Sequence, residues 1–140
     1  LYFGIICRKA AGEFPPQAAG PRPRDADLAR QDRVSLHIDI DRDWVTAYRF
    51  EVDRRGWVRE ELWGEPGWNP TWFVAAGETA DRWTAEIAIP FAELTEHHPS
   101  NAQTWAIGVF RELPAGGVQS WTVPFEGVGM QPGCGYLMFR

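Results

Sequence analysis

The fold is decided by the segment VSLHIDI at residues 34–40, in which apolar and polar side chains alternate strictly. A period of two places every second side chain on the same face, which is typical of a strand that buries one face against a core. The segment YRFEVD at 48–53 repeats the pattern, and the polar residues 41–44 suit the turn of a hairpin. The two segments therefore predict a pair of adjacent antiparallel strands.

Further strands with the same period follow along the chain. Pro90 closes the segment WTAEIAI at 83–89, because proline cannot donate to a strand ladder, and Gly77 breaks the strand that begins at Trp72. Only 91–94 reads as a helical turn. The pattern predicts an all-β domain over residues 1–140, an antiparallel β-sandwich of two sheets with jelly-roll or immunoglobulin-like architecture. The remaining predicted strands are 57–62, 72–76, 105–109, 118–123 and 136–139.

Composition narrows the classes of function. The chain has 140 residues, a formal net charge of −5 and 44% hydrophobic residues, which fit one folded domain with its own core. The negative charge argues against a nucleic-acid partner, because phosphate contacts need a basic face. No apolar run approaches the ~18 residues of a membrane-spanning helix. We therefore expect neither a nucleic-acid partner nor a membrane span.

The start of the sequence, the stretch before residue 32 and the two cysteines lie outside the strand pattern described so far. The apolar run at 1–7 opens the sequence at once, so we expect a piece of a longer protein that lacks its N-terminal segment. Residues 9–31 are rich in proline and alanine and predict an irregular surface excursion. Cys7 and Cys134 could form one disulfide or remain two thiols; thiols are favoured because Cys7 occupies a core position.

Catalytic motifs are missing from the sequence. There is no nucleophile elbow, zinc-protease motif or phosphate-binding loop. Glu51 and Glu86 lie on polar strand faces and could form an acid/base pair at glycosidase spacing. An ion pair between Glu51 and Arg49 is the stronger interpretation. We therefore expect a protein that is not an enzyme.

Metal and cofactor sites are weakly indicated. Asp39, Asp41 and Asp43 recur at every second position across a turn and are weak candidates for calcium ligands, although turns favour aspartate anyway. His97 and His98 are adjacent in a polar loop, a poor arrangement for a metal. Haem would need an axial pair, and none is well placed. We expect no cofactor, with calcium as the alternative.

Tryptophan supplies the remaining candidate site. Trp83 and Trp105 continue core alternations, whereas Trp44, Trp63 and Trp68 lie among turn residues. An indole can stack on the C–H face of a sugar ring, and a strand face carrying Arg49 and Glu51 could bind the hydroxyl groups. The loop tryptophans could equally fold back as lids over the edge of the core.

Several segments together resemble the domain similar to the family 9 carbohydrate-binding module. They are LYFGI at 1–5, DRVSLHID at 32–39, TAYRFEVD at 46–53 with Gly56, WTAEIAIPF at 83–91 and WAIGVFR at 105–111. The match covers most of the chain from residue 1 to 111, and its most specific element ends at Ile89-Pro90-Phe91. The segment that normally precedes the first strand is not in this sequence, so we expect either that residues outside it complete the fold or that the sandwich is trimmed at one edge. The resemblance implies an antiparallel β-sandwich related to the DOMON superfamily, and a module of a larger exported bacterial protein, extracellular or periplasmic, often attached to a glycoside hydrolase.

The resemblance also implies a function and possible contacts. Family 9 modules hold the end of a sugar chain between two tryptophans, often with bound calcium. The expected function is a non-catalytic carbohydrate-binding module that tethers its parent protein to a polysaccharide or oligosaccharide. The alternative is a structural or interaction module, with other domains of the parent protein as partners. Arg49 and Arg111 carry over as possible hydroxyl contacts. The candidate binding residues are Trp44, Arg49, Glu51, Trp63, Trp68 and Arg111.

Overall fold

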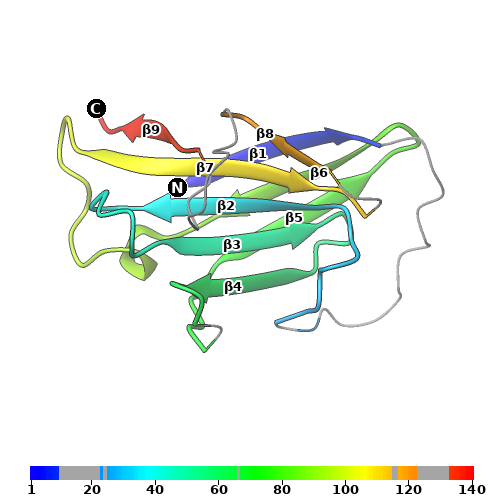
Figure 1. The fold of residues 1–140 in the computed structure, drawn as a ribbon, viewed down its shortest axis with the longest axis horizontal. Helices are drawn as coiled ribbons and strands as arrows, with labels where there is room; N and C mark the ends of the chain where they lie inside the picture. Colours follow the sequence, from blue (N-terminus) through cyan, green and yellow to red (C-terminus); the bar gives the residue numbers. More distant parts are fainter. Residues whose placement is uncertain (10–22, 24, 66, 115–116, 123–132) are drawn as a thin grey trace.

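The computed structural model describes residues 1–9, 23, 25–65, 67–114, 117–122 and 133–140. These residues form two antiparallel sheets that lie one behind the other and enclose a common core (Figure 1). The predicted all-β sandwich is confirmed. Within the described ranges, no helix is long and apolar enough to cross a membrane.

The smaller sheet has three strands in the order β1-β6-β5. Strand β1 (Tyr2–Arg8) and strand β5 (Phe73–Glu78) flank the central strand β6 (Arg82–Ala88). After β6, Pro90 precedes the 3₁₀ turn η1 (Phe91–Glu93), where the helical turn is expected. Gly77 does not end β5, as the sequence suggests, because it pairs with Thr84 and the ladder continues to Glu78.

The larger sheet has six strands, of which five follow the order β4-β3-β2-β7-β8. Strand β2 (Arg33–Asp39) is central and pairs with β3 (Tyr48–Asp53) on one side and β7 (Thr104–Glu112) on the other. Strand β4 (Val58–Leu62) pairs with β3, and both β8 (Val118–Ser120) and β9 (Gly135–Met138) pair with β7. The predicted hairpin of β2 and β3 is present.

The core lies between the sheets and follows the alternation of the strands. Leu36 and Phe50 face inward from the larger sheet, and Trp83 faces inward from the smaller one. Trp105 is also fully buried, as its position in the strand pattern predicts. Folding removes a large apolar area of each of these side chains from water, which stabilises the folded state by roughly 25 cal/mol per Å² buried.

Part of the irregular stretch before β2 is buried, and the two cysteines lie far apart in the fold. Residues 9–31 are not wholly a surface excursion, because Ala26 and Leu28 are buried; residues 10–22 and 24 lie outside the described part. Cys7 and Cys134 are both free thiols, as predicted. They lie on opposite sides of the larger sheet, since Cys7 belongs to the core and Cys134 lies over Gly108 on the outer face.

A buried carboxylate, that of Asp32, connects the two sheets. Asp32, immediately before β2, accepts a hydrogen bond of 2.9 Å from the indole of Trp83 in β6. Its two oxygens also accept bonds of 2.8 and 2.7 Å from Arg111 in β7, and Arg111 in turn donates to the Arg8 carbonyl oxygen in β1. Because Asp32 is almost fully buried, its charge depends on these partners.

We expect the substitution Asp32→Ala to lower the free energy of unfolding by about 3–5 kcal/mol, because it leaves the Arg111 guanidinium without its counter-ion in the interior. Urea denaturation of the variant and of wild type measures the difference. Glu96→Ala, which removes an exposed carboxylate, serves as the control and should stay within about 0.5 kcal/mol of wild type. Equal losses in the two variants would contradict a special role for Asp32.

Candidate functional site

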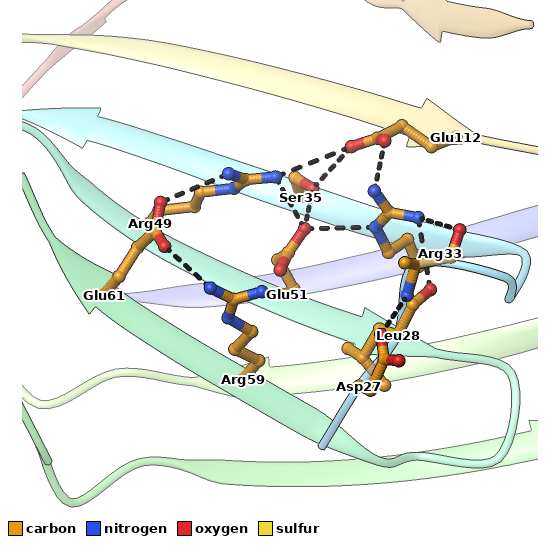
Figure 2. A network of polar contacts seen from close by, with 10 residues as sticks. Asp27, Leu28, Arg33, Ser35, Arg49, Glu51, Arg59, Glu61 and Glu112 are labelled. Atoms are coloured by element: carbon orange, nitrogen blue, oxygen red, sulfur yellow. Dashed lines mark hydrogen bonds and ion pairs between the residues drawn. The ribbon is translucent and has the colours of Figure 1, made fainter. Parts of the chain in front are cut away.

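The outer face of the larger sheet carries a network of alternating charges (Figure 2). Its centre is Glu51 in β3, whose Oε1 accepts hydrogen bonds from Arg33 Nε at 3.1 Å, Arg49 NH2 at 2.7 Å and the Ser35 hydroxyl at 3.1 Å. Register brings these side chains together, because Ser35 lies directly opposite Glu51 on the neighbouring strand. The Glu51 carboxylate is buried, and all three of these donors converge on one of its oxygens.

Arg49 is held within the same network. It donates to Glu61 at 3.2 Å, and its guanidinium lies 3.7 Å from Glu112, which also pairs with Arg33. Burial, the largest single effect, lowers the pKa of Arg49, but the nearby carboxylates together raise it above its ordinary value. The guanidinium is therefore committed to intramolecular pairs, and this face has the character of a structural ion network.

Arg111 lies on the other side of the sheet from Arg49. Arg49 is directly opposite His37, which faces outward, whereas Arg111 is opposite Val34, which faces the core. The Arg111 guanidinium binds Asp32, and this pairing is the first cause of its raised pKa. The structure does not bring the two arginines into one site.

Trp68 packs on the edge of the core. Its ring lies 5.0 Å from that of Tyr48 and 5.4 Å from that of Phe50, measured between centroids, in tilted and edge-to-face geometry. Tyr48 also donates from its hydroxyl to the Leu94 carbonyl oxygen at 2.9 Å, which fixes the platform beneath the indole. The sequence allowed the loop tryptophans either to stack on a sugar or to fold back as lids over the edge of the core. Trp68 folds back as a lid.

Trp63 is displayed at the tip of a tight turn. Leu62 and Glu65 exchange two backbone hydrogen bonds of 3.2 and 2.8 Å, so Trp63 and Gly64 are the two central residues of a hairpin turn. Both have positive φ, 51° and 80°, as a type I′ turn requires, and asparagine or glycine is the usual choice there. The Trp63 side chain is 62% exposed.

Trp44 lies at the same end of the sandwich as Trp63. The Trp63 amide donates to the Ala47 carbonyl oxygen at 2.9 Å, which joins the turn after β4 to the loop between β2 and β3 that carries Trp44. Trp44 is 44% exposed and has φ of 62°, and its amide donates to Asp39 Oδ2 at 3.0 Å. The structure therefore places two of the six predicted binding residues as exposed indoles on adjoining loops at one end of the sandwich.

The three aspartates of the β2–β3 loop approach one another. One carboxylate oxygen from each of Asp39, Asp41 and Asp43 lies within 4.8 Å of the others. All three accept bonds from loop amides, such as Arg42 N to Asp39 at 2.7 Å and Val45 N to Asp43 at 2.7 Å. Burial, the largest single effect, together with the neighbouring Asp41 raises the pKa of Asp39 despite its amide donors, whereas amide donors lower the pKa of Asp43. Loop geometry accounts for this cluster, and its oxygens are of the type that calcium prefers.

The two glutamates considered as an acid/base pair are separated. Glu51 lies on the outer face of the larger sheet, and Glu86 lies on the outer face of the smaller one, with the core between them. They cannot flank one glycosidic bond, which requires carboxylates within ~10 Å of each other on two sides of a sugar.

Sequence reasoning missed a groove over the smaller sheet. It has a volume of about 480 Å³, and its walls include the exposed rings of Tyr2 and Phe73. Both residues occupy outward positions of their strands, opposite the phase of the core residues. An aromatic residue in the outward phase of an amphipathic strand was the signal available in the sequence.

The fold is shared with a solved protein of low sequence similarity. A protein from Bacteroides uniformis described as a "putative carbohydrate-binding protein" superposes with a TM-score of 0.62 at 15% identity, over 99% of this chain and 71% of that one. A family 9 carbohydrate-binding module from Caldicellulosiruptor kristjanssonii, solved with glucose, gives a TM-score of 0.47 at 11% identity, over 62% and 44% of the two chains. No family model matches the sequence, and no curated protein matches it significantly. At 15% identity, the likeness to the Bacteroides protein shows the fold alone.

The polar face also predicts a pH dependence of stability. His37 in β2 stacks edge-to-face on Phe110 at 5.2 Å, and its pKa is lowered to about 4, first by burial and then by Arg49. Below pH 6.5 the unfolded chain binds a proton at this residue that the folded chain does not, so stability falls as pH falls from 6.5 to about 4. We expect this loss to be about 1–3 kcal/mol larger in wild type than in His37→Gln.

Urea denaturation at several pH values between these limits measures that difference. The variant His97→Gln, in an exposed loop, controls for the loss of a histidine and should follow the wild-type curve. Parallel curves for wild type and His37→Gln would show that His37 does not carry the effect.

Proposed function

We propose that this protein binds carbohydrate without catalysing a reaction, and that Trp63 stacks on a sugar ring with Trp44 beside it. The observation that carries the proposal is the turn at 62–65, which holds a large, exposed indole in a backbone conformation that suits asparagine or glycine. A bulky residue at positive φ costs roughly 1–2 kcal/mol, and such strain concentrates at ligand sites.

The chemistry of this end of the sandwich supports the proposal. The exposed face of an indole offers a flat apolar surface to the C–H groups of a pyranose ring. The loop that carries Trp44 also carries the carboxylates of Asp41 and Asp43, which are exposed and can accept bonds from sugar hydroxyls. Stacking and hydrogen bonding are thus available on adjacent loops, outside the ion network.

The proposed role in the cell is tethering. A non-catalytic domain in an exported bacterial protein would hold that protein near an insoluble polysaccharide and so raise its effective concentration there. Weak binding by one domain suffices for this role. The shared fold with the Bacteroides protein is consistent with the proposal and does not by itself establish the ligand.

We expect Trp63→Asn to weaken polysaccharide binding by about tenfold or more and, at the same time, to raise stability by about 0.5–1 kcal/mol. The indole is lost from the platform, while asparagine suits the left-handed turn position better. Affinity gels with a panel of soluble and insoluble polysaccharides measure binding, and urea denaturation measures stability. The panel is run with calcium and with a chelator, because the three loop aspartates adjoin Trp44.

The matched control is Trp121→Ala, which removes an indole that is 56% exposed beside β8 and should leave retention unchanged. Retention of one glycan by wild type and by the control, but not by Trp63→Asn, would establish the platform. If wild type binds no glycan, or if Trp63→Asn binds as wild type does, the proposal fails and the structural module becomes the better interpretation.

A further inference from the structure

The groove over the smaller sheet is built as a slot between two aromatic side chains. Tyr2 in β1 and Phe73 in β5 are both register partners of Ala88 in β6, one on each side. Neighbouring strands are about 4.8 Å apart, so the two aromatic residues stand about 10 Å apart with only a methyl group between them. Tyr2 is 89% exposed and Phe73 is 61% exposed. The slot is open to solvent and wide enough to admit a flat ring.

Glu86 forms the polar part of the groove. It occupies the next outward position of β6, and its register partners are Gly4 and Ala75, which leave it unshielded on both sides. A Cβ atom built on Gly4 would meet no atom within 4 Å. The Glu86 carboxylate makes no hydrogen bond or ion pair with any other residue that the structure describes.

The charges of the groove select the kind of ligand. Among the described residues that line it, Glu86 alone is charged, and the lining contains no arginine, lysine or histidine. The faces of aromatic rings are electronegative and attract cations, as does the carboxylate. A neutral sugar would meet one acceptor group and few donors here, whereas a protonated amine satisfies both the carboxylate and the rings.

We propose that this groove is a second binding site, for a sugar that carries a free protonated amine. The apolar face of the sugar ring lies between Tyr2 and Phe73, and the ammonium group pairs with Glu86. The site is on the opposite sheet from the ion network and does not use Trp63 or Trp44. It goes beyond the function proposed above, and either site can exist without the other.

Two tetrasaccharides that differ only in acetylation test the site. The glucosamine tetramer carries free amines, and the N-acetylglucosamine tetramer carries none. At mildly acidic pH and low salt, we expect calorimetry to show binding of the glucosamine tetramer at least tenfold tighter than binding of its acetylated counterpart. Glu86→Gln should weaken binding of the glucosamine tetramer by about tenfold or more and leave the acetylated tetramer unaffected, since a hydrogen bond to a charged group is lost.

A second variant tests the same site while Glu86 itself stays unchanged. Gly4→Lys places an ammonium group directly across the strand pair from Glu86, where open space is available, and should abolish binding of the glucosamine tetramer by internal competition. Glycine in a strand interior is not required by this backbone, so the variant should fold. Its unfolding transition verifies that it does.

The outcomes separate this site from the first one. The measurements are repeated in the Trp63→Asn background, from which the first platform is removed, and the preference for the glucosamine tetramer over its acetylated counterpart should persist there. The proposal is overturned if the two tetramers bind equally, if neither binds, or if Glu86→Gln and Gly4→Lys bind the glucosamine tetramer as well as wild type.

Discussion

The buried pairing of Asp32 with Arg111 and Trp83 is the interaction on which the rest of the sandwich depends. One carboxylate, just before the central strand of the larger sheet, receives donors from both sheets. Arg111 extends the connection to the first strand through the Arg8 carbonyl oxygen. A charge removed from water is stable only while all of its partners are present, so the two sheets are fixed relative to each other at this end. The exposed loops at the other end can then vary without altering how the sheets pack.

The outer faces of the two sheets differ in how their charged side chains are paired. On the larger sheet, Glu51 and Arg49 belong to a network in which every charged group has a partner within the protein. On the smaller sheet, Glu86 has the small residues Gly4 and Ala75 as its neighbours and lines the same groove as the rings of Tyr2 and Phe73. Charges that already pair with one another gain little from a ligand, whereas a carboxylate that has no partner among the described residues gains one. Binding capacity is therefore expected away from the most highly charged surface.

Much of the fold could be predicted from the sequence, because the two-residue period at 34–40 and 48–53 reflects the same burial that holds the sheets together. The candidate binding site was harder to predict from the sequence. Trp63 and Trp68 are five residues apart in one polar loop, and only a tight turn and contact with Phe50 distinguish the exposed indole from the packed one. The sequence could have shown that Arg111 faces the core, since it lies an even number of residues from the inward-facing Trp105 in the same strand. The outward phase of Tyr2 likewise pointed to the groove.

Among the described residues, the two central residues of the turn, Trp63 and Gly64, make one backbone hydrogen bond to another element, from the Trp63 amide to Ala47, and the turn lies at the far end of β4 from the Asp32 cluster. Its central residue can therefore be exchanged without disturbing the core. A lineage could lose the indole and gain stability in one step, or acquire a different side chain and a different ligand. Recognition at this position is free to change faster than the fold that supports it. A library restricted to residues 63 and 64 would sample new ligand preferences while every member kept the same sandwich.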